Sequence, residues 1–161
     1  MQPKATAKVS IKNQHQLKGL GYVEHLLMSL PPWRLPLDEL RWGRFLSDED
    51  ALVWIDWRGE TNIKLVFLNG AQVESPEVSE HEIVLGLEET SLALDDDRIM
   101  REGPLIKTAL SMIPGLQKLI PLRSLRANEC KWRSRGILRR GEYLSVGWAI
   151  HEIVRWRNSD A

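Results

Sequence analysis

The chain has a single cysteine, no long uninterrupted apolar run and no net charge, and each of these features removes a class of protein. With only Cys130, an internal disulfide framework and a pair of metal-ligating thiolates are excluded. Without an apolar stretch of about 20 residues, no helix can span a membrane. The 22 basic residues are balanced by 22 acidic ones, whereas general nucleic-acid binders carry a clear basic excess. We therefore expect no transmembrane segment and no nucleic-acid partner.

The motifs of several common enzyme classes are missing as well. The sequence shows no Gly-rich phosphate loop, no zinc-ligand spacing and no Ser/His/Asp signature. We therefore expect no cofactor and no metal. The N-terminal stretch MQPKATAKVSIKN has no apolar core of the kind that signal peptides carry, so the default expectation is a cytoplasmic protein. At 161 residues, the chain is expected to form one domain over residues 1–161.

What the chain does contain is tryptophan, seven in all, with four of them between Leu17 and Gly59. A Pro-rich corner from Pro31 to Pro36 interrupts this stretch and should break any sheet there. Most of the remaining chain consists of runs of apolar and β-branched residues, which are typical of strands. The strand-like runs are Lys4–Lys12, Gly19–Leu30, Glu39–Phe45, Ala51–Arg58, Ile63–Leu68, Ile83–Leu94, Leu125–Leu138 and Tyr143–Trp156.

Turn signals separate these runs. Asn69-Gly70 is the strongest hairpin signal in the chain, and the stretch from Asp95 to Arg98 is also predicted to turn. One helix is predicted at Pro104–Ile113, because Gly103-Pro104 can start it and Pro114-Gly115 can stop it. About eight strands and one late helix predict a mainly β protein, in which an antiparallel sheet closes into a barrel. A β-sandwich is the alternative.

The run Ala51–Arg58 carries an acidic residue on a face with apolar neighbours. Alternation places Trp54, Asp56 and Arg58 on one face and Trp57 on the other. A carboxyl group buried among aromatic rings holds its proton more tightly, because desolvation disfavours the charged form. Asp56 is therefore a candidate general acid. The alternative is a carboxylate that forms an ion pair with Arg58, two positions along the same face.

Other charged residues also allow two interpretations. His25 could orient an acid or accept a proton from water, or it could simply be satisfied by a backbone carbonyl. Glu152 on an apolar face is either the ion-pair partner of an arginine such as Arg44 or a second acid in a cavity. The basic positions around Arg133 and Arg135 are either a solvated strand face or a docking patch for an anionic partner.

One short motif resembles a known family. Gly21-Tyr22-Val23-Glu24-His25, followed about thirty residues later by Trp54-Ile55-Asp56, is similar to the hydroxyneurosporene synthase family, which includes carotenoid 1,2-hydratases. In the hydratases the motif Gly-Tyr-His-Asp-His-Asn-Trp-Gly lines a cavity, and a Tyr-x-Asp pair lies on a neighbouring strand. By this similarity Glu24 stands in place of the Asp, and His25 in place of the second His. Trp54 and Asp56 stand in place of the Tyr-x-Asp pair.

The resemblance implies a lipocalin-like barrel. Members of the family usually have two such barrels in tandem, whereas this chain is long enough for only one. A second barrel or a homo-oligomer is therefore an implied partner. The chain also departs from the motif, because its first His is Val23 and its Asn, Trp and Gly are Leu26, Leu27 and Met28. These losses favour ligand binding over catalysis.

Three hypotheses for function follow. The first is a lipocalin-like protein that binds an isoprenoid or another apolar small molecule in a barrel cavity. The second is a hydratase or lyase-type enzyme that acts on an isoprenoid double bond. The third is a non-catalytic protein-interaction module with a filled core. The candidate catalytic residues are Asp56, His25 and Glu24, and the candidate ligand-binding residues are Tyr22, Trp42, Trp54 and Trp148.

Overall fold

The computed structural model describes residues 2–12, 15–25, 27, 36–86, 89–104 and 127–156, and those ranges contain strands and turns but no helix. The strands are β1 (Gln2–Ile11), β2 (His15–Val23), β3 (Leu37–Leu46), β4 (Ala51–Gly59), β5 (Ile63–Leu68), β6 (Ala71–Gln72), β7 (Glu77–Val78), β8 (Glu82–Val84), β9 (Thr90–Pro104), β10 (Ala127–Arg140) and β11 (Tyr143–Trp156). The prediction of a mainly β protein is confirmed.

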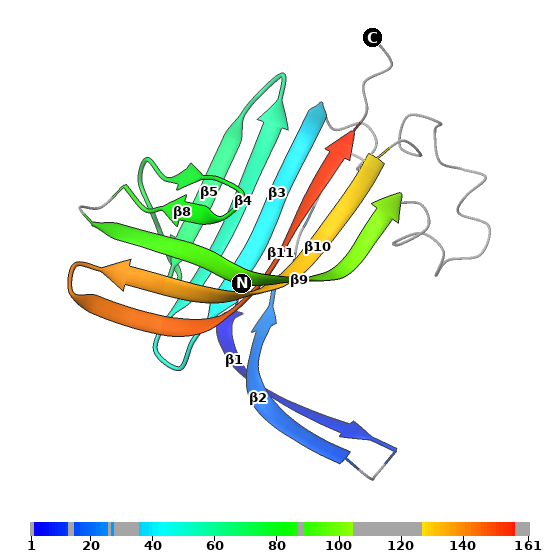
Figure 1. Ribbon diagram of the computed structural model, residues 1–161, viewed down its shortest axis with the longest axis vertical. Coiled ribbons are helices and arrows are strands. Elements are labelled where there is room, and N and C mark those ends of the chain that lie inside the picture. Colours follow the sequence, from blue (N-terminus) through cyan, green and yellow to red (C-terminus); the bar gives the residue numbers. More distant parts are fainter. Residues whose placement is uncertain are drawn as a thin grey trace.

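Nine of the strands form one antiparallel sheet in the order β6-β5-β4-β3-β11-β10-β9-β8-β7, and β1 and β2 form a separate hairpin. Figure 1 shows the large sheet curling strongly, with β8 in front of β4 and β5 and the hairpin extending away from it. The two edge strands, β6 and β7, are connected by residues 73–76 alone. The sheet therefore curls far enough to bring its edges close together, which confirms a barrel-like antiparallel architecture.

Several predicted elements are found at or near their expected positions. The runs at Ile63–Leu68 and Tyr143–Trp156 are β5 and β11. The turn after β5 has the two positive φ values, 52° at Asn69 and 88° at Gly70, that this hairpin type requires. The faces of β4 are also as predicted, because Trp54 is opposite Gly43 and Val66 in a row that faces the core.

Other predicted elements are wrong. The run Ile83–Leu94 is divided between β8 and β9, with Gly86 at a φ of 66° in the loop between them. The stretch from Asp95 to Arg98 continues β9 instead of turning, because a bulge at Asp96, with a φ of 51°, absorbs the irregularity. Strand β2 ends at Val23, whereas the sequence predicted a strand that continues to Leu30.

The predicted helix at Pro104–Ile113 lies almost entirely outside the described residues. Its expected first residue, Pro104, is the last residue of β9 and pairs with Asn128 of β10. The strand therefore continues through the Gly103-Pro104 pair that was predicted to start a helix. The part of the chain that the structure describes contains no helix with the length and apolar character needed to cross a membrane.

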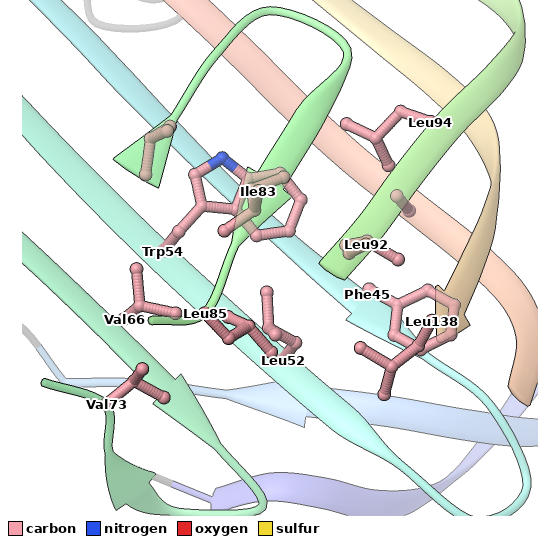
Figure 2. Close-up of a cluster of buried hydrophobic side chains, with 12 residues drawn as sticks. Phe45, Leu52, Trp54, Val66, Val73, Ile83, Leu85, Leu92, Leu94 and Leu138 are labelled. Atoms are coloured by element: carbon pink, nitrogen blue, oxygen red, sulfur yellow. The ribbon is translucent and has the colours of Figure 1, made fainter. Parts of the chain in front are cut away.

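The core lies on the inner face of the curled sheet. Residues 73–85, which we call the strap, cross this face, and Val78, Ile83 and Leu85 pack there with Leu52 and Trp54 of β4 (Figure 2). Burying such side chains is worth about 1.5–3 kcal/mol each.

Three glycines make room for large rings on the inner face. A Cβ added at Gly43 would lie 2.1 Å from the ring of Trp54, and one added at Gly136 would lie 2.4 Å from the ring of Phe45. Gly147, directly opposite Gly136 in the ladder, also lies under Phe45. From Ser145 to Ala149 the inner side of β11 is therefore lined by small residues, and the apolar side chains of that stretch face outward.

Candidate functional site

Three of the four predicted ligand-binding residues lie on the outer face of the large sheet or against it. Trp42 of β3 and Trp148 of β11 both point outward, and Tyr22 of β2 reaches this face from the hairpin. Trp54 instead lies in the core, where only 2% of its surface is exposed. The structure therefore brings together the aromatic residues of the outer face and separates Trp54 from them.

A groove of about 310 Å³ lies between the hairpin and the outer face. Its lining residues are Leu20, Gly21, Tyr22, Arg44, Leu46, Trp148 and Ile150. The ring of Trp42 stands beside it, 6.4 Å from that of Tyr22 and tilted by 60°. The hairpin is held to the sheet at its other strand as well, where the Lys4 ammonium donates to the main-chain carbonyl of Asp48.

Two arginines lie over aromatic rings at this groove. The guanidinium of Arg44 is 5.3 Å from the centre of the Tyr22 ring and 5.7 Å from that of Trp42. The guanidinium of Arg133 lies 4.5 Å from the centre of the Trp148 ring. Such cation–π contacts stabilise by about 0.5–1 kcal/mol at exposed sites. They hold the rings in place and give an otherwise apolar groove a positive rim.

The hydroxyl of Tyr22 donates to Oε2 of Glu24 at 2.6 Å. Partial burial, and then this bond to Glu24, raise the pKa of the Tyr22 hydroxyl above its ordinary value. Glu24, predicted as a catalytic residue, therefore orients Tyr22. His25 is exposed, and no contact among the described residues connects it with Asp56.

Asp56 lies on the opposite, inner face of the sheet, where 2% of its surface is exposed. Its Oδ2 accepts a hydrogen bond of 2.7 Å from Nε of Arg58. The same guanidinium donates to Oε1 of Glu39 at 3.2 Å and to the carbonyl of Val78 in the strap at 2.8 Å. The ion pair with Arg58 that the sequence allowed is present, and it ties β4 to the strap.

Glu39 is the centre of this inner network. Besides Arg58, it accepts hydrogen bonds from Nε of Arg41 at 2.6 Å and Nε of Arg155 at 2.7 Å. Burial opposes ionisation of Glu39, but the bonds from Arg155 and Arg41 outweigh it and hold the pKa of the carboxyl below its ordinary value. The network is thus charged and internally satisfied, which is the arrangement of a structural cluster.

Glu152 is likewise a carboxylate with a basic partner. It lies on β11 opposite Lys131 of β10, and its Oε2 is 2.5 Å from the Lys131 ammonium. The prediction of an ion pair is confirmed, although the partner is Lys131 and not Arg44. This leaves Arg44 with aromatic rings as its neighbours.

A second inner cluster joins residues that are far apart in the sequence. The hydroxyl of Ser134 lies 2.7 Å from Nε2 of His151 and donates to Oδ1 of Asp97, whose other oxygen is 3.3 Å from Nδ1 of His81. The imidazole of His151 stacks on the ring of Trp132, with centroids 5.2 Å apart. Burial lowers the pKa of His151, against the opposing effect of the Asp97 carboxylate.

This cluster is a hydrogen-bonded chain and not a nucleophilic triad. In a triad the carboxylate bonds the nitrogen of the imidazole that faces away from the serine, whereas here Asp97 approaches Ser134 and Nε2 of His151. Ser134 is also completely buried, so its oxygen cannot reach a substrate.

No local signal in the sequence indicates this cluster. The bulge at Asp96 sets two residues opposite Ser134 and turns Asp97 inward, and a run of three aspartates had indicated a turn. Within the described ranges, no group of histidine, cysteine and acidic side chains is arranged to hold a metal ion.

Comparison with known proteins adds no assignment. A scan against protein-family models finds no match, and a search of curated proteins finds none either.

Proposed function

We propose that this chain binds an isoprenoid or another apolar small molecule, and that the groove between the hairpin and the outer face of the sheet is its site. The observation that carries this proposal is the gathering of Tyr22 and Trp148 around one apolar hollow, with Leu46 and Ile150 as its floor. Ligand sites are concave and mostly apolar, with volumes from about 300 Å³ upward. The groove is at the lower end of that range, and Trp148 is 52% exposed there.

The sequence predicted a ligand inside a barrel, as in lipocalins. The strongly curled antiparallel sheet supports a lipocalin-like relationship, and we retain that relationship and the resemblance to hydroxyneurosporene synthases as proposals. The interior around Trp54, however, is packed by the strap. This packing favours the outer groove over the barrel interior as the place where the ligand lies.

The hydratase hypothesis has less support. It requires Asp56 to give a proton to the substrate, whereas its carboxyl group lies on the inner face and accepts a hydrogen bond from Arg58. Asp56→Asn should therefore leave ligand binding unchanged, because the carboxylate is on the inner face. A loss of turnover of a carotenoid substrate in this variant would restore the enzymatic hypothesis.

The binding proposal can be tested with retinol, an isoprenoid alcohol, by following the quenching of tryptophan fluorescence. We expect saturable binding to the wild-type chain. Trp148→Ala should weaken it by about tenfold or more, because a large ring that covers the ligand is lost. Ile63→Ala is the matched control, because Ile63 is also an exposed apolar side chain of the large sheet, but it belongs to β5 and does not line the groove.

Two outcomes would contradict the proposal. Equal retinol affinity in the wild-type chain and in Trp148→Ala would remove the groove as the site. Absence of saturable binding, together with a dimer in sedimentation experiments that Trp148→Ala dissociates, would support the interaction-module hypothesis instead.

A further inference from the structure

The outer groove has a charge pattern that an uncharged ligand would not need. Arg133 of β10, Ile150 of β11 and Arg44 of β3 lie directly opposite one another in the ladder. Neighbouring strands are about 4.8 Å apart, so the two arginines start roughly 10 Å from each other. Both flank Ile150, which lines the groove. Their side chains are long enough to converge on one group above it.

Both arginines lack an acidic partner among the described residues, unlike the arginines of the inner face. Arg58 and Arg155 share Glu39, and Arg140 pairs with Asp50. Arg44 and Arg133 instead lie against aromatic rings. Nε of Arg133 is buried without a hydrogen-bond acceptor in the described part of the chain, as is Nε of Arg140, but Arg140 has a carboxylate partner and Arg133 has none there. A buried donor that lacks an acceptor costs about 1–3 kcal/mol. An anion at this position would supply the missing acceptor and the missing charge.

An apolar stripe continues from this pair of arginines along the outer face of β11. Trp148, Val146 and Leu144 follow Ile150 at alternate positions, and each is about half exposed, at 52%, 51% and 50%. At about 3.3 Å per residue, the stripe from Ile150 to Leu144 is roughly 20 Å long. Its length suits a single extended hydrocarbon chain.

We propose that the ligand of the groove is a long-chain amphiphile with a carboxylate head. This inference rests on the proposed function and names the chemical class of its ligand. The head lies between Arg44 and Arg133, and the chain follows the stripe past Trp148. Charge-assisted bonds from two guanidinium groups are the strongest that the groove can form. The carboxylate of Glu24, at the rim of the groove, already accepts a hydrogen bond from the hydroxyl of Tyr22.

The test compares retinol with retinoic acid, which has the same chain and a carboxylate head, at pH 7.5 by tryptophan quenching. We expect the wild-type chain to bind retinoic acid about tenfold more tightly than retinol, because of the added charge-assisted bonds. Arg133→Gln and Arg44→Gln should each reduce this preference, because each weakens the binding of retinoic acid more than that of retinol. Arg139→Gln removes the same charge from the far end of the same face of β10 and should keep the full preference.

The alternative outcomes are distinguishable. Equal affinity for the two retinoids, or a preference that both variants retain, overturns the carboxylate inference but leaves apolar binding intact. Absence of binding by either retinoid removes the proposed function and this inference together. Arginine-dependent binding to phosphatidylglycerol vesicles, without a preference for free retinoic acid, overturns the inference in favour of docking to an anionic membrane surface.

Discussion

The two faces of the large sheet carry similar residues but differ in how far those residues are buried and paired. On the inner face, Trp54 is buried under the strap, and the buried acid Asp56 is bonded to Arg58. On the outer face, Trp148 is half exposed, and Arg133 lies over its ring without an acidic partner among the described residues. The inner face is complete in itself, whereas the outer face keeps both apolar surface and charge for another molecule.

This difference shows that residue type alone does not locate a binding site. Both faces carry tryptophan and arginine, and both alternate in the pattern of a strand. The two faces differ in whether the strap covers the tryptophan and in whether acidic residues pair with the arginines. The same substitution should therefore change the free energy of unfolding by different amounts on the two faces.

The largest expected effect is at the inner tryptophan. Trp54→Ala should lower the free energy of unfolding by about 3–5 kcal/mol, because it leaves a cavity in a core that is packed from both sides. Trp148→Ala, the same change on the outer face, should alter it by about 1 kcal/mol or less. Urea unfolding followed by circular dichroism measures both. Similar losses in the two variants would mean that the outer face is covered by part of the same fold.

A smaller effect is expected at the glycine under Trp54. Gly43→Ala should cost about 1–3 kcal/mol, because its Cβ would lie 2.1 Å from the Trp54 ring and 2.7 Å from Cβ of His151. Gly19→Ala, in the hairpin, is the matched control, because a Cβ there meets nothing within 4 Å. If Gly43→Ala unfolds at the same urea concentration as the control, the inner face is less tightly packed than the structure indicates.

Sequence reasoning predicted local features well and long-range ones poorly. The strands β5 and β11, the Asn69-Gly70 turn and the shared face of Trp54, Asp56 and Arg58 all follow from period-two alternation and turn chemistry. Such features depend only on residues close in the sequence, which explains why they could be predicted.

The outward orientation of the apolar side of β11 could not be predicted in this way. It depends on β3, a strand distant in the sequence, because the main-chain oxygen of Leu46 and the ring of Phe45 leave no room for a side chain at Gly147. The His151 cluster was missed for a similar reason. It requires a bulge in β9 and a register between β9, β10 and β11 that brings Asp97 and Ser134 to the imidazole.

A pH dependence of stability is the smallest effect that we predict. Burial lowers the pKa of His151, so the folded state binds fewer protons than the unfolded state between that lowered value and about 6.5. Stability from this residue is therefore present above about pH 6.5 and decreases as the pH falls through the lowered pKa. The charged groups that act on it are Asp97 and Glu80, which oppose the shift in pKa, and His81, which adds to it.

The test measures the free energy of unfolding of the wild-type chain and of His151→Gln from pH 8 to pH 5. The wild-type chain should lose more stability over this interval than the variant, whose residue does not titrate. Equal slopes in the two proteins would show that His151 is solvated in the folded state and that the inner face is open to water near Trp132.

The central claim is that ligand is received by the outer face and not by the barrel interior. The most direct test follows the indole N–H signals of ¹⁵N-tryptophan-labelled protein by NMR during a retinol titration, with assignments from Trp42→Phe, Trp54→Phe and Trp148→Phe. If the ligand lies in the outer groove, the Trp148 and Trp42 signals should shift in a saturable way while the Trp54 signal stays in place. A shift of the Trp54 signal with the Trp148 signal unchanged would place the ligand inside the barrel and contradict the account.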